Sequence, residues 1–310
     1  MELHVKKANI LEQMVLQNIA QDAFLQLSGG MMKEKRDTFL AIYNGLNPVG
    51  CAVLLARNCP SDGLEIQCIH IFKEYRGRHY AKECITVIKD YTKQAGYTCL
   101  YVRLVESHQY AEVLKAVLRY SGFSPYDKAE IMSCRVSGEN QVIWQETLGK
   151  YYDKLGAWLE RQGIKTVSFA EANEELIHKL LHDKGLEFDS RYNIESICQN
   201  TQGIFLKDAS FIAYRNDTPV AITMLLEADE KALVFQLISE AKTYQKMGTI
   251  ILPIVKSMDW SFRSKYEKVS FCIFDYNTPM KKVSDNIFSK MIYKQTIQYC
   301  YRCQLEEEDR

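Results

Sequence analysis

The chain has 310 residues, of which 47% are hydrophobic and 25% charged, and its 39 basic and 39 acidic residues give no formal net charge. This composition is typical of globular domains that bury a core, and the length fits one large or two ordinary domains. Zero net charge argues against a general binder of nucleic acids or anionic membranes, because affinity for both depends on basic excess.

The sequence also predicts a compartment. No run approaches the roughly 18 apolar residues that a membrane helix needs, and Met1–Val5 does not begin a signal peptide, so we expect a cytoplasmic protein without a membrane partner. The ten cysteines, scattered through apolar runs, are expected to be buried thiols there. Cys300 and Cys303 lie three apart in a predicted strand and face opposite ways, so no metal site is predicted.

The first part of the chain alternates strand and helix patterns. Strands are predicted over 3–8, 38–43, 49–55, 66–71, 97–105 and 129–136, and helices over 11–27, 81–94 and 110–120. Gly, Pro and Asn mark the turns between them. This order predicts an α/β domain with a mixed, partly antiparallel sheet flanked by helices.

Residues 138–162 are predicted to form a linker helix. Its apolar stripe consists of Trp144, Leu148, Tyr151, Tyr152, Leu155 and Leu159. The expected role of this stripe is packing between two domains.

The pattern then repeats. Strands are predicted over 166–169, 211–214, 220–226, 233–239, 266–274 and 296–303, and helices over 172–182, 251–258 and 280–291. Tyr75 and Tyr244 are 169 positions apart, as are Tyr97 and Tyr266. Offsets this constant predict a duplicated domain, with one copy over 1–137 and the second over 163–310.

The turn Glu74–Ala81 organises the first copy. It follows the strand 66–71 and opens a helix, so it presents unpaired backbone N–H groups and the positive end of a helix dipole. Arg76 and Arg78 stand beside that helix end. The combination suits a diphosphate, and the alternative is a helix cap with solvated arginines.

This turn resembles the acyl-CoA pyrophosphate loop of the GCN5-related N-acetyltransferases (GNAT), whose pattern is Gln/Arg-x-x-Gly-x-Gly/Ala. Arg76 and Ala81 match the first and last positions, while His79 stands where the pattern has Gly. Arg119–Phe123 resembles the closing Lys-x-Gly-Phe of the family. The resemblance implies two tandem GNAT-like domains.

The second copy matches the same pattern differently. Gln245 and Gly248 fit its first and fourth positions, but Ile250 departs from the sixth, and Pro253 removes an N–H from the following helix. We therefore expect acyl-CoA in the N-terminal copy. The C-terminal copy is expected to be degenerate, shaping the acceptor pocket or a dimer surface.

Acetyl-CoA is the co-substrate that the resemblance implies. Its pantetheine would pair with the strand before the loop, and its diphosphate would bind the loop itself. Ser107 stands where the family often has an Asn. The implied cofactor-binding residues are Ile69, Ile71, Arg76, Gly77, Arg78, His79, Tyr80, Ala81 and Ser107.

Glu65 is the candidate general base. It lies 11 positions before Arg76 (76 − 65), as a glutamate does in the histone-acetyltransferase branch of the family, and the alternative is a solvated edge residue. The same position of the second copy is Val234. The family's proton donor to the CoA thiolate is a Tyr at the position of Leu118, and the nearby Tyr120 is the candidate here.

The resemblance therefore implies an acyl-CoA-dependent N-acyltransferase that acts on an amine of a small molecule or peptide. A non-catalytic acyl-CoA sensor or scaffold with two decayed transferase folds is the alternative. A FemABX-like aminoacyl transferase would need a basic groove for tRNA, and no Lys/Arg cluster marks one. No nucleic-acid partner is predicted. The sequence does not determine the oligomeric state, and a homodimer is one possibility.

Overall fold

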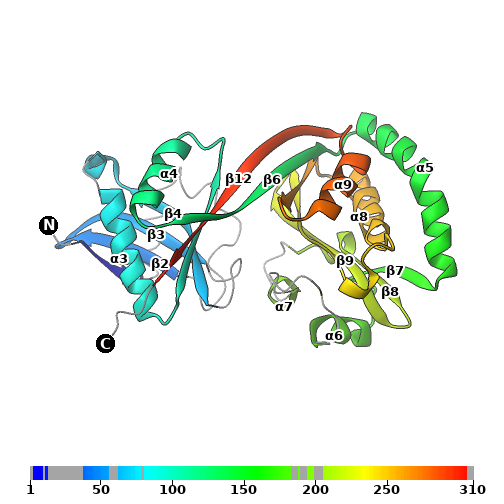
Figure 1. Ribbon diagram of the computed structural model, residues 1–310, viewed down its shortest axis with the longest axis horizontal. Coiled ribbons are helices and arrows are strands. Elements are labelled where there is room, and N and C mark those ends of the chain that lie inside the picture. The colour runs from blue at the N-terminus through cyan, green and yellow to red at the C-terminus, as the bar shows by residue number, and fades with distance from the viewer. Residues whose placement is uncertain are drawn as a thin grey trace. The chain divides into compact units, whose positions relative to one another are not determined.

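The computed structural model describes residues 3–9, 11–12, 38–55, 62–77, 80–182, 188, 194–198 and 205–305. The predicted helix over 11–27 lies outside them except for its first two residues. The chain forms two compact units, coloured by residue number in Figure 1. Unit 1 is Met1–Ala129 with Thr296–Arg310, and unit 2 is Glu130–Gln295.

Unit 1 is a mixed sheet with helices. Its own strands are β1 (Leu3–Lys7), β2 (Thr38–Asn44), β3 (Asn47–Leu55), β4 (Gly63–Ile71) and β5 (Cys99–Val105). Its helices are α3 (Tyr80–Gln94), α4 (Ala111–Tyr120) and the 3-10 turn η1 (Lys73–Tyr75). The strands β6 (Ser124–Arg135) and β12 (Ile292–Gln304) contribute to both units, which gives unit 1 the order β1-β2-β3-β4-β5-β12-β6. Pairing is antiparallel from β1 to β4 and parallel between β4 and β5.

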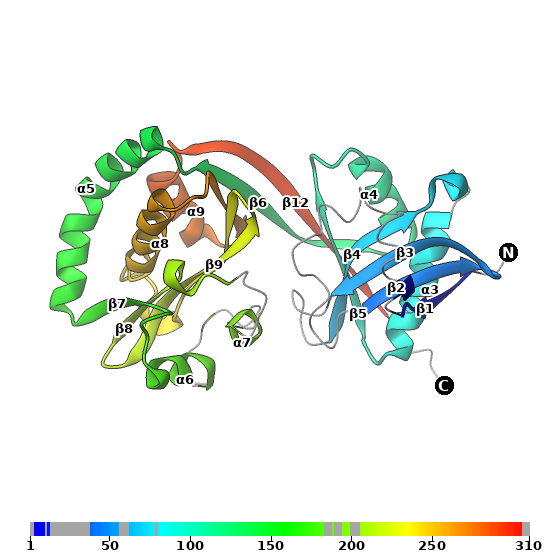
Figure 2. The ribbon, with the colours of Figure 1, turned by 180° about the vertical axis from the view of Figure 1, so that it is seen from behind.

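Helix α3 covers one face of this sheet, where it packs against β1, β4 and β5 (Figures 1 and 2). Cys84, Ile85 and Ile88 recur at helical spacing and are buried there, as the sequence periodicity predicts. They join Leu64 of β4 and Leu100 of β5 in the larger core cluster of the unit. A second cluster on the other face contains Phe39, Cys51, Val53 and Phe72.

Unit 2 repeats this arrangement. Its own strands are β7 (Ile164–Ser168), β8 (Phe211–Arg215), β9 (Thr218–Asp229), β10 (Ala232–Glu240) and β11 (Lys268–Phe274). Its helices are α5 (Gly138–Arg161), α6 (Glu174–His182), α7 (Ile194–Cys198), α8 (Ile251–Arg263) and α9 (Thr278–Ile287), with the 3-10 turns η2 (Lys207–Ala209) and η3 (Lys242–Tyr244). The strand order is β12-β6-β11-β10-β9-β8-β7.

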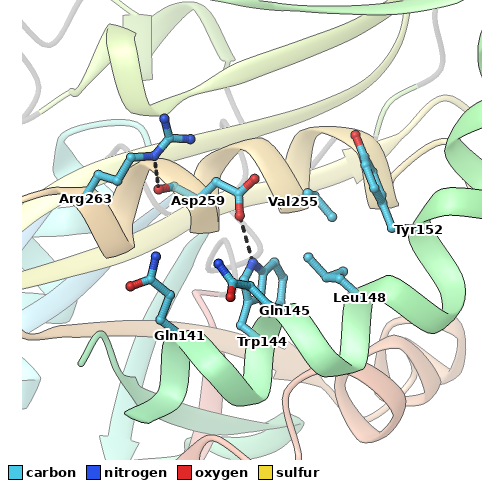
Figure 3. Close-up of a pocket in the computed structure, with 8 residues that line it drawn as sticks. All are labelled: Gln141, Trp144, Gln145, Leu148, Tyr152, Val255, Asp259 and Arg263. Carbon is cyan, nitrogen blue, oxygen red and sulfur yellow. Dashed lines mark hydrogen bonds between the residues drawn. The ribbon is translucent and has the colours of Figure 1, made fainter. Parts of the chain in front are cut away.

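The predicted linker helix is α5, and its apolar stripe packs within unit 2. Trp144, Leu148 and Leu159 are buried in the unit 2 core. The Trp144 indole N–H donates to the Asp259 carboxylate of α8 at 2.9 Å, and both residues line an open cavity of about 360 Å³ (Figure 3). The stripe that was expected to pack between domains thus belongs to the core of the second unit.

The strand pairings of unit 1 recur in unit 2 at a constant sequence offset. The parallel pairing of β4 with β5 ends at Glu65 and Tyr101, and that of β10 with β11 ends at Val234 and Ser270, both 169 positions later. Gln67 is the extra residue of a bulge in β4, and its counterpart in β10 is Gln236, also 169 positions on. The predicted fold class, two tandem mixed α/β domains, is therefore confirmed.

The C-terminal strand completes the sheet of unit 1. Residues Gln298–Gln304 of β12 pair antiparallel with β5, and Leu305 N donates to Thr98 O at 2.7 Å. Tyr301, Cys303 and Leu305 are buried in the unit 1 core. The sequence division assigned this strand to the second domain, because hydrophobic alternation does not tell which sheet a strand joins.

Truncation of the full chain tests this contribution. A chain ending at Gln295 loses the buried side chains of Tyr301, Cys303 and Leu305 from the unit 1 core, each worth about 1.5–3 kcal/mol, so we expect unit 1 to unfold or lose more than about 4 kcal/mol. A chain ending at Leu305 keeps them and should unfold like the full protein. Urea unfolding followed by circular dichroism measures both, and equal curves for the two truncations would contradict the assignment of β12 to unit 1.

Candidate functional site

Strands β4 and β5 part after three parallel pairs. Beyond Glu65, β4 stays with β3 as far as Ile71, which pairs with Gly50. Beyond Tyr101, β5 continues alongside β12 instead. The two strands thus follow different partners, and the backbone of Ile69 and Ile71 has no ladder partner on β5 in the pairing described.

The turn after β4 leads directly to α3. Phe72 N donates to Val49 O at 3.0 Å, η1 follows, and Gly77 has a φ of +79°, a conformation that favours glycine. Arg76 is exposed, and its Nε donates to Ile71 O at 2.9 Å, which folds the guanidinium back to the end of β4. Arg78 and His79 lie outside the described residues.

The first turn of α3 is anchored in unit 1. The Tyr80 ring is buried against Tyr75, and its hydroxyl accepts the Asn44 side-chain N–H at 3.1 Å. Ala81 is half-buried beside it. Since Tyr80 is held by the core, it positions the helix end, while Ala81 presents only a methyl group there.

Glu65 is buried, with 3% of its surface exposed, at the point where β4 and β5 part. Its Oε2 lies 3.7 Å from Nη1 of Arg103 on β5, and this ion pair offsets the burial of the charge. The alternative reading of Glu65 as a solvated edge residue is therefore wrong.

Two tyrosines accompany the ion pair. The rings of Tyr101 and Tyr126 pack edge-on with their centroids 5.7 Å apart. The phenol of Tyr126 also interacts electrostatically with Arg103 and Glu65. Burial raises the pKa of Tyr126 to about 12, further above neutral pH than the ordinary value near 10, so its phenol is a proton donor rather than an anion. The candidate site therefore holds a carboxylate, a guanidinium and a phenol.

The sequence analysis did not select Arg103 or Tyr126. A signal for Arg103 was available, since a lone charge in the apolar run Tyr97–Val105 is unusual for a buried strand. Tyr126 precedes the strand predicted at 129–136, whereas β6 begins at Ser124. Its proximity to Glu65 follows from sheet order, which periodicity does not reveal.

The two remaining predicted residues lie at exposed positions. Tyr120 is 80% exposed in the last turn of α4, about 200° around the helix from the buried Leu118. Ser107 is exposed in the turn that follows β5.

The described part of the chain contains no group of three or more His, Cys, Asp or Glu side chains arranged to hold a metal ion. It also contains no helix with the length and apolar character needed to cross a membrane.

Comparison with known proteins relates the N-terminal part of the chain to one family. The sequence model of the acetyltransferase (GNAT) family matches residues 12–119. The N-terminal half of the chain contains a GNAT-family domain. No curated protein matches the chain.

Solved structures extend the similarity to the whole fold. A tandem GNAT protein from the clavulanic acid biosynthesis pathway superposes with a TM-score of 0.66 at 11% identity, covering 99% of both chains. A GCN5-related N-acetyltransferase from Sphaerobacter thermophilus gives a TM-score of 0.57 at 10% identity, covering 98% of this chain and 96% of the other. The chain thus has the tandem GNAT fold from end to end.

Removing the Arg103 side chain tests the ion pair. We expect Arg103→Ala to lower the free energy of unfolding by about 3 kcal/mol, since the buried Glu65 charge loses this partner. Glu65→Gln combined with Arg103→Ala should cost less than the sum of the single changes, by about 1–3 kcal/mol. Urea unfolding of the four proteins measures this coupling energy, and additive costs would show that the two side chains do not interact.

Proposed function

We propose that this tandem GNAT protein is an acyl-CoA-dependent N-acyltransferase. It transfers an acyl group from acetyl-CoA, or another acyl-CoA, to the amine of a small molecule or peptide. The observation that carries the proposal is a buried carboxylate, Glu65, at the point where β4 and β5 part, just ahead of the Arg76 turn and α3. Proteins of the GNAT family are N-acetyltransferases that use acetyl-CoA and amine acceptors.

The cofactor lies along the end of β4 in this proposal. The pantetheine amides pair with the backbone of Ile69 and Ile71, where β5 has turned away. The diphosphate binds the backbone N–H groups from Arg78 to Ala81, in the loop that begins at Arg76 and Gly77. The positive end of the α3 dipole and the arginines supply the attraction. Ser107 contacts the cofactor from the turn after β5.

The chemistry follows from the charges of the site. Glu65 takes a proton from the acceptor ammonium, so that the nitrogen lone pair can attack the thioester carbonyl. The C–N bond forms, the C–S bond breaks, and the CoA thiolate takes a proton. Tyr120 is the proposed donor of that proton, and Tyr126 is a second phenol that lies nearer to Glu65.

A non-catalytic acyl-CoA sensor is the second candidate. It is favoured by unit 2, where Val234 replaces the carboxylate and Ile250 replaces the alanine at the helix start. Release of free thiol from acetyl-CoA with a panel of amines separates the two candidates. We further propose that the protein is cytoplasmic and that it forms a homodimer.

The loop arginines are tested by CoA affinity. Arg76→Ala combined with Arg78→Ala should weaken CoA binding by about 1–3 kcal/mol, the scale of charge-assisted hydrogen bonds. Isothermal titration with CoA measures it. The matched control is Lys246→Ala in the corresponding loop of unit 2, which should leave the affinity unchanged. An unaltered affinity in the double variant would remove the arginines from the site.

Glu65→Gln tests the general base. The amide keeps the shape of the side chain but takes no proton, so we expect kcat to fall about 10²–10⁴-fold while CoA affinity holds. The loss should shrink as pH rises, because more of the amine then arrives already deprotonated. Val234→Ala, the matched change in unit 2, should leave the rate unchanged. Full turnover of Glu65→Gln at pH 7 would exclude Glu65 as the base.

A further inference from the structure

The side chain of Glu240 caps the amino end of α8 in unit 2. Its Oε1 accepts the backbone N–H of Ile250 at 3.1 Å and the hydroxyl of Thr249, and the backbone of Thr249 is also hydrogen-bonded to the carboxyl group. Glu240 is the last residue of β10, so the strand supplies a carboxyl group to the helix that follows its own loop. A carboxylate at such a helix end is an anion in the place that helix dipoles favour.

The loop in unit 2 is the counterpart of the candidate diphosphate loop in unit 1. The 3-10 turns η1 and η3 are 169 positions apart, and Gly77 and Lys246 both have a φ of +79° at matching positions. Ala241 N donates to Val220 O just as Phe72 N donates to Val49 O. In this register Glu240 takes the position of Ile71, an apolar residue packed against the unit 1 core.

The other donors at the start of α8 are already used. Ile251 N donates to Gly248 O at 3.1 Å, and Leu252 N donates to Thr249 O at 3.2 Å. Pro253 has no N–H to offer. Each of the first amides of α8 therefore has a partner within the protein.

The side chain of Leu155 from α5 covers the same loop. A Cβ placed on Gly248 would meet a methyl group of Leu155 at 3.3 Å. Burial raises the pKa of Glu240, while its hydrogen bonds from Thr249 and Ile250 oppose that shift. A second anion that approached this loop would therefore contact the apolar side chain of Leu155, and it would find the backbone N–H groups at the start of α8 already hydrogen-bonded.

We propose that the Glu240 carboxyl group is a built-in substitute for the cofactor diphosphate, and that it closes the loop of unit 2 to acyl-CoA. Unit 2 then keeps the fold of a CoA-binding domain without the ligand, and one chain takes one acyl-CoA. The stoichiometry of one acyl-CoA per chain rests on the proposed function of unit 1, whereas the closure of the unit 2 loop does not.

Hydrogen–deuterium exchange of the full chain tests the closure. In the wild type, saturating CoA should leave exchange at residues 248–254 unchanged. Glu240→Ala should speed exchange at Thr249 and Ile250 about tenfold, the loss expected for a removed helix cap. Glu240→Gln keeps an acceptor oxygen and should retain slow exchange, and Ile71→Ala, the matched change in unit 1, should not affect these amides.

Two results would overturn the closure: protection of 248–254 by CoA in the wild type, or unchanged exchange at Thr249 and Ile250 in Glu240→Ala. If CoA protected neither loop, the proposed function of unit 1 would fail, and the exchange of Glu240→Ala would still decide the role of Glu240.

The reciprocal change transfers the closure to unit 1. Ile71→Glu should weaken CoA binding more than tenfold, because the new carboxylate can reach the start of α3, while the neutral isostere Ile71→Gln should weaken it far less. Isothermal titration measures both. Equal affinities of the two variants would contradict the idea that a carboxylate at this position excludes the diphosphate, and absence of CoA binding by the wild type would contradict the proposed function instead.

Discussion

The structure of the candidate site depends on the short parallel pairing between β4 and β5. The two strands share only three residue pairs, after which β4 remains with β3 and β5 remains with β12. The bulge at Gln67 begins where the pairing ends, and a bulge increases the local twist of a strand. Gly50 permits close contact further along, since a Cβ there would lie 2.3 Å from His70 O. Glu65 occupies the last paired position before the strands part.

Duplication provides an internal comparison for that position. In unit 2 the same pairing ends at Val234 and Ser270, and the Ser270 hydroxyl shares a 2.8 Å hydrogen bond with Ser133 of β6. The backbone geometry is thus kept where the buried charge is absent, so the charge of Glu65 is not required to form it. A buried ion pair contributes little net stability, so the presence of Glu65 and Arg103 in unit 1, where unit 2 has Val234 and Cys272, supports the proposal that Glu65 acts as a base.

The parts of this structure that sequence reasoning predicted are local. Helical spacing of Cys84, Ile85 and Ile88 identified the buried face of α3, and constant offsets between tyrosines revealed the duplication. The parts that it missed join residues far apart in the chain. Pairing of β12 with β5, the contact of Arg103 with Glu65 and the proximity of Tyr126 all depend on sheet order, which hydrophobic alternation leaves undetermined.

The same distinction applies to the loops Arg76–Ala81 of unit 1 and Gln245–Ile250 of unit 2. Ile250 and Pro253 could be read as departures from the loop pattern, because each stands at a defined position of a local motif. The role of Glu240 could not be read from the sequence, because its carboxyl group accepts hydrogen bonds from residues nine and ten positions later, across a turn. Such a contact requires the turn geometry, including the positive φ of Lys246 and Gly248.

A crystal structure of the full chain with bound acetyl-CoA tests the proposed site most directly. We expect the diphosphate at the loop Arg76–Ala81, the pantetheine along Ile69 and Ile71, and the thioester carbonyl beside Glu65. The loop of unit 2 should retain the Glu240 carboxyl group at Ile250. A diphosphate bound at Gln245–Ile250, or a thioester remote from Glu65, would contradict this expectation.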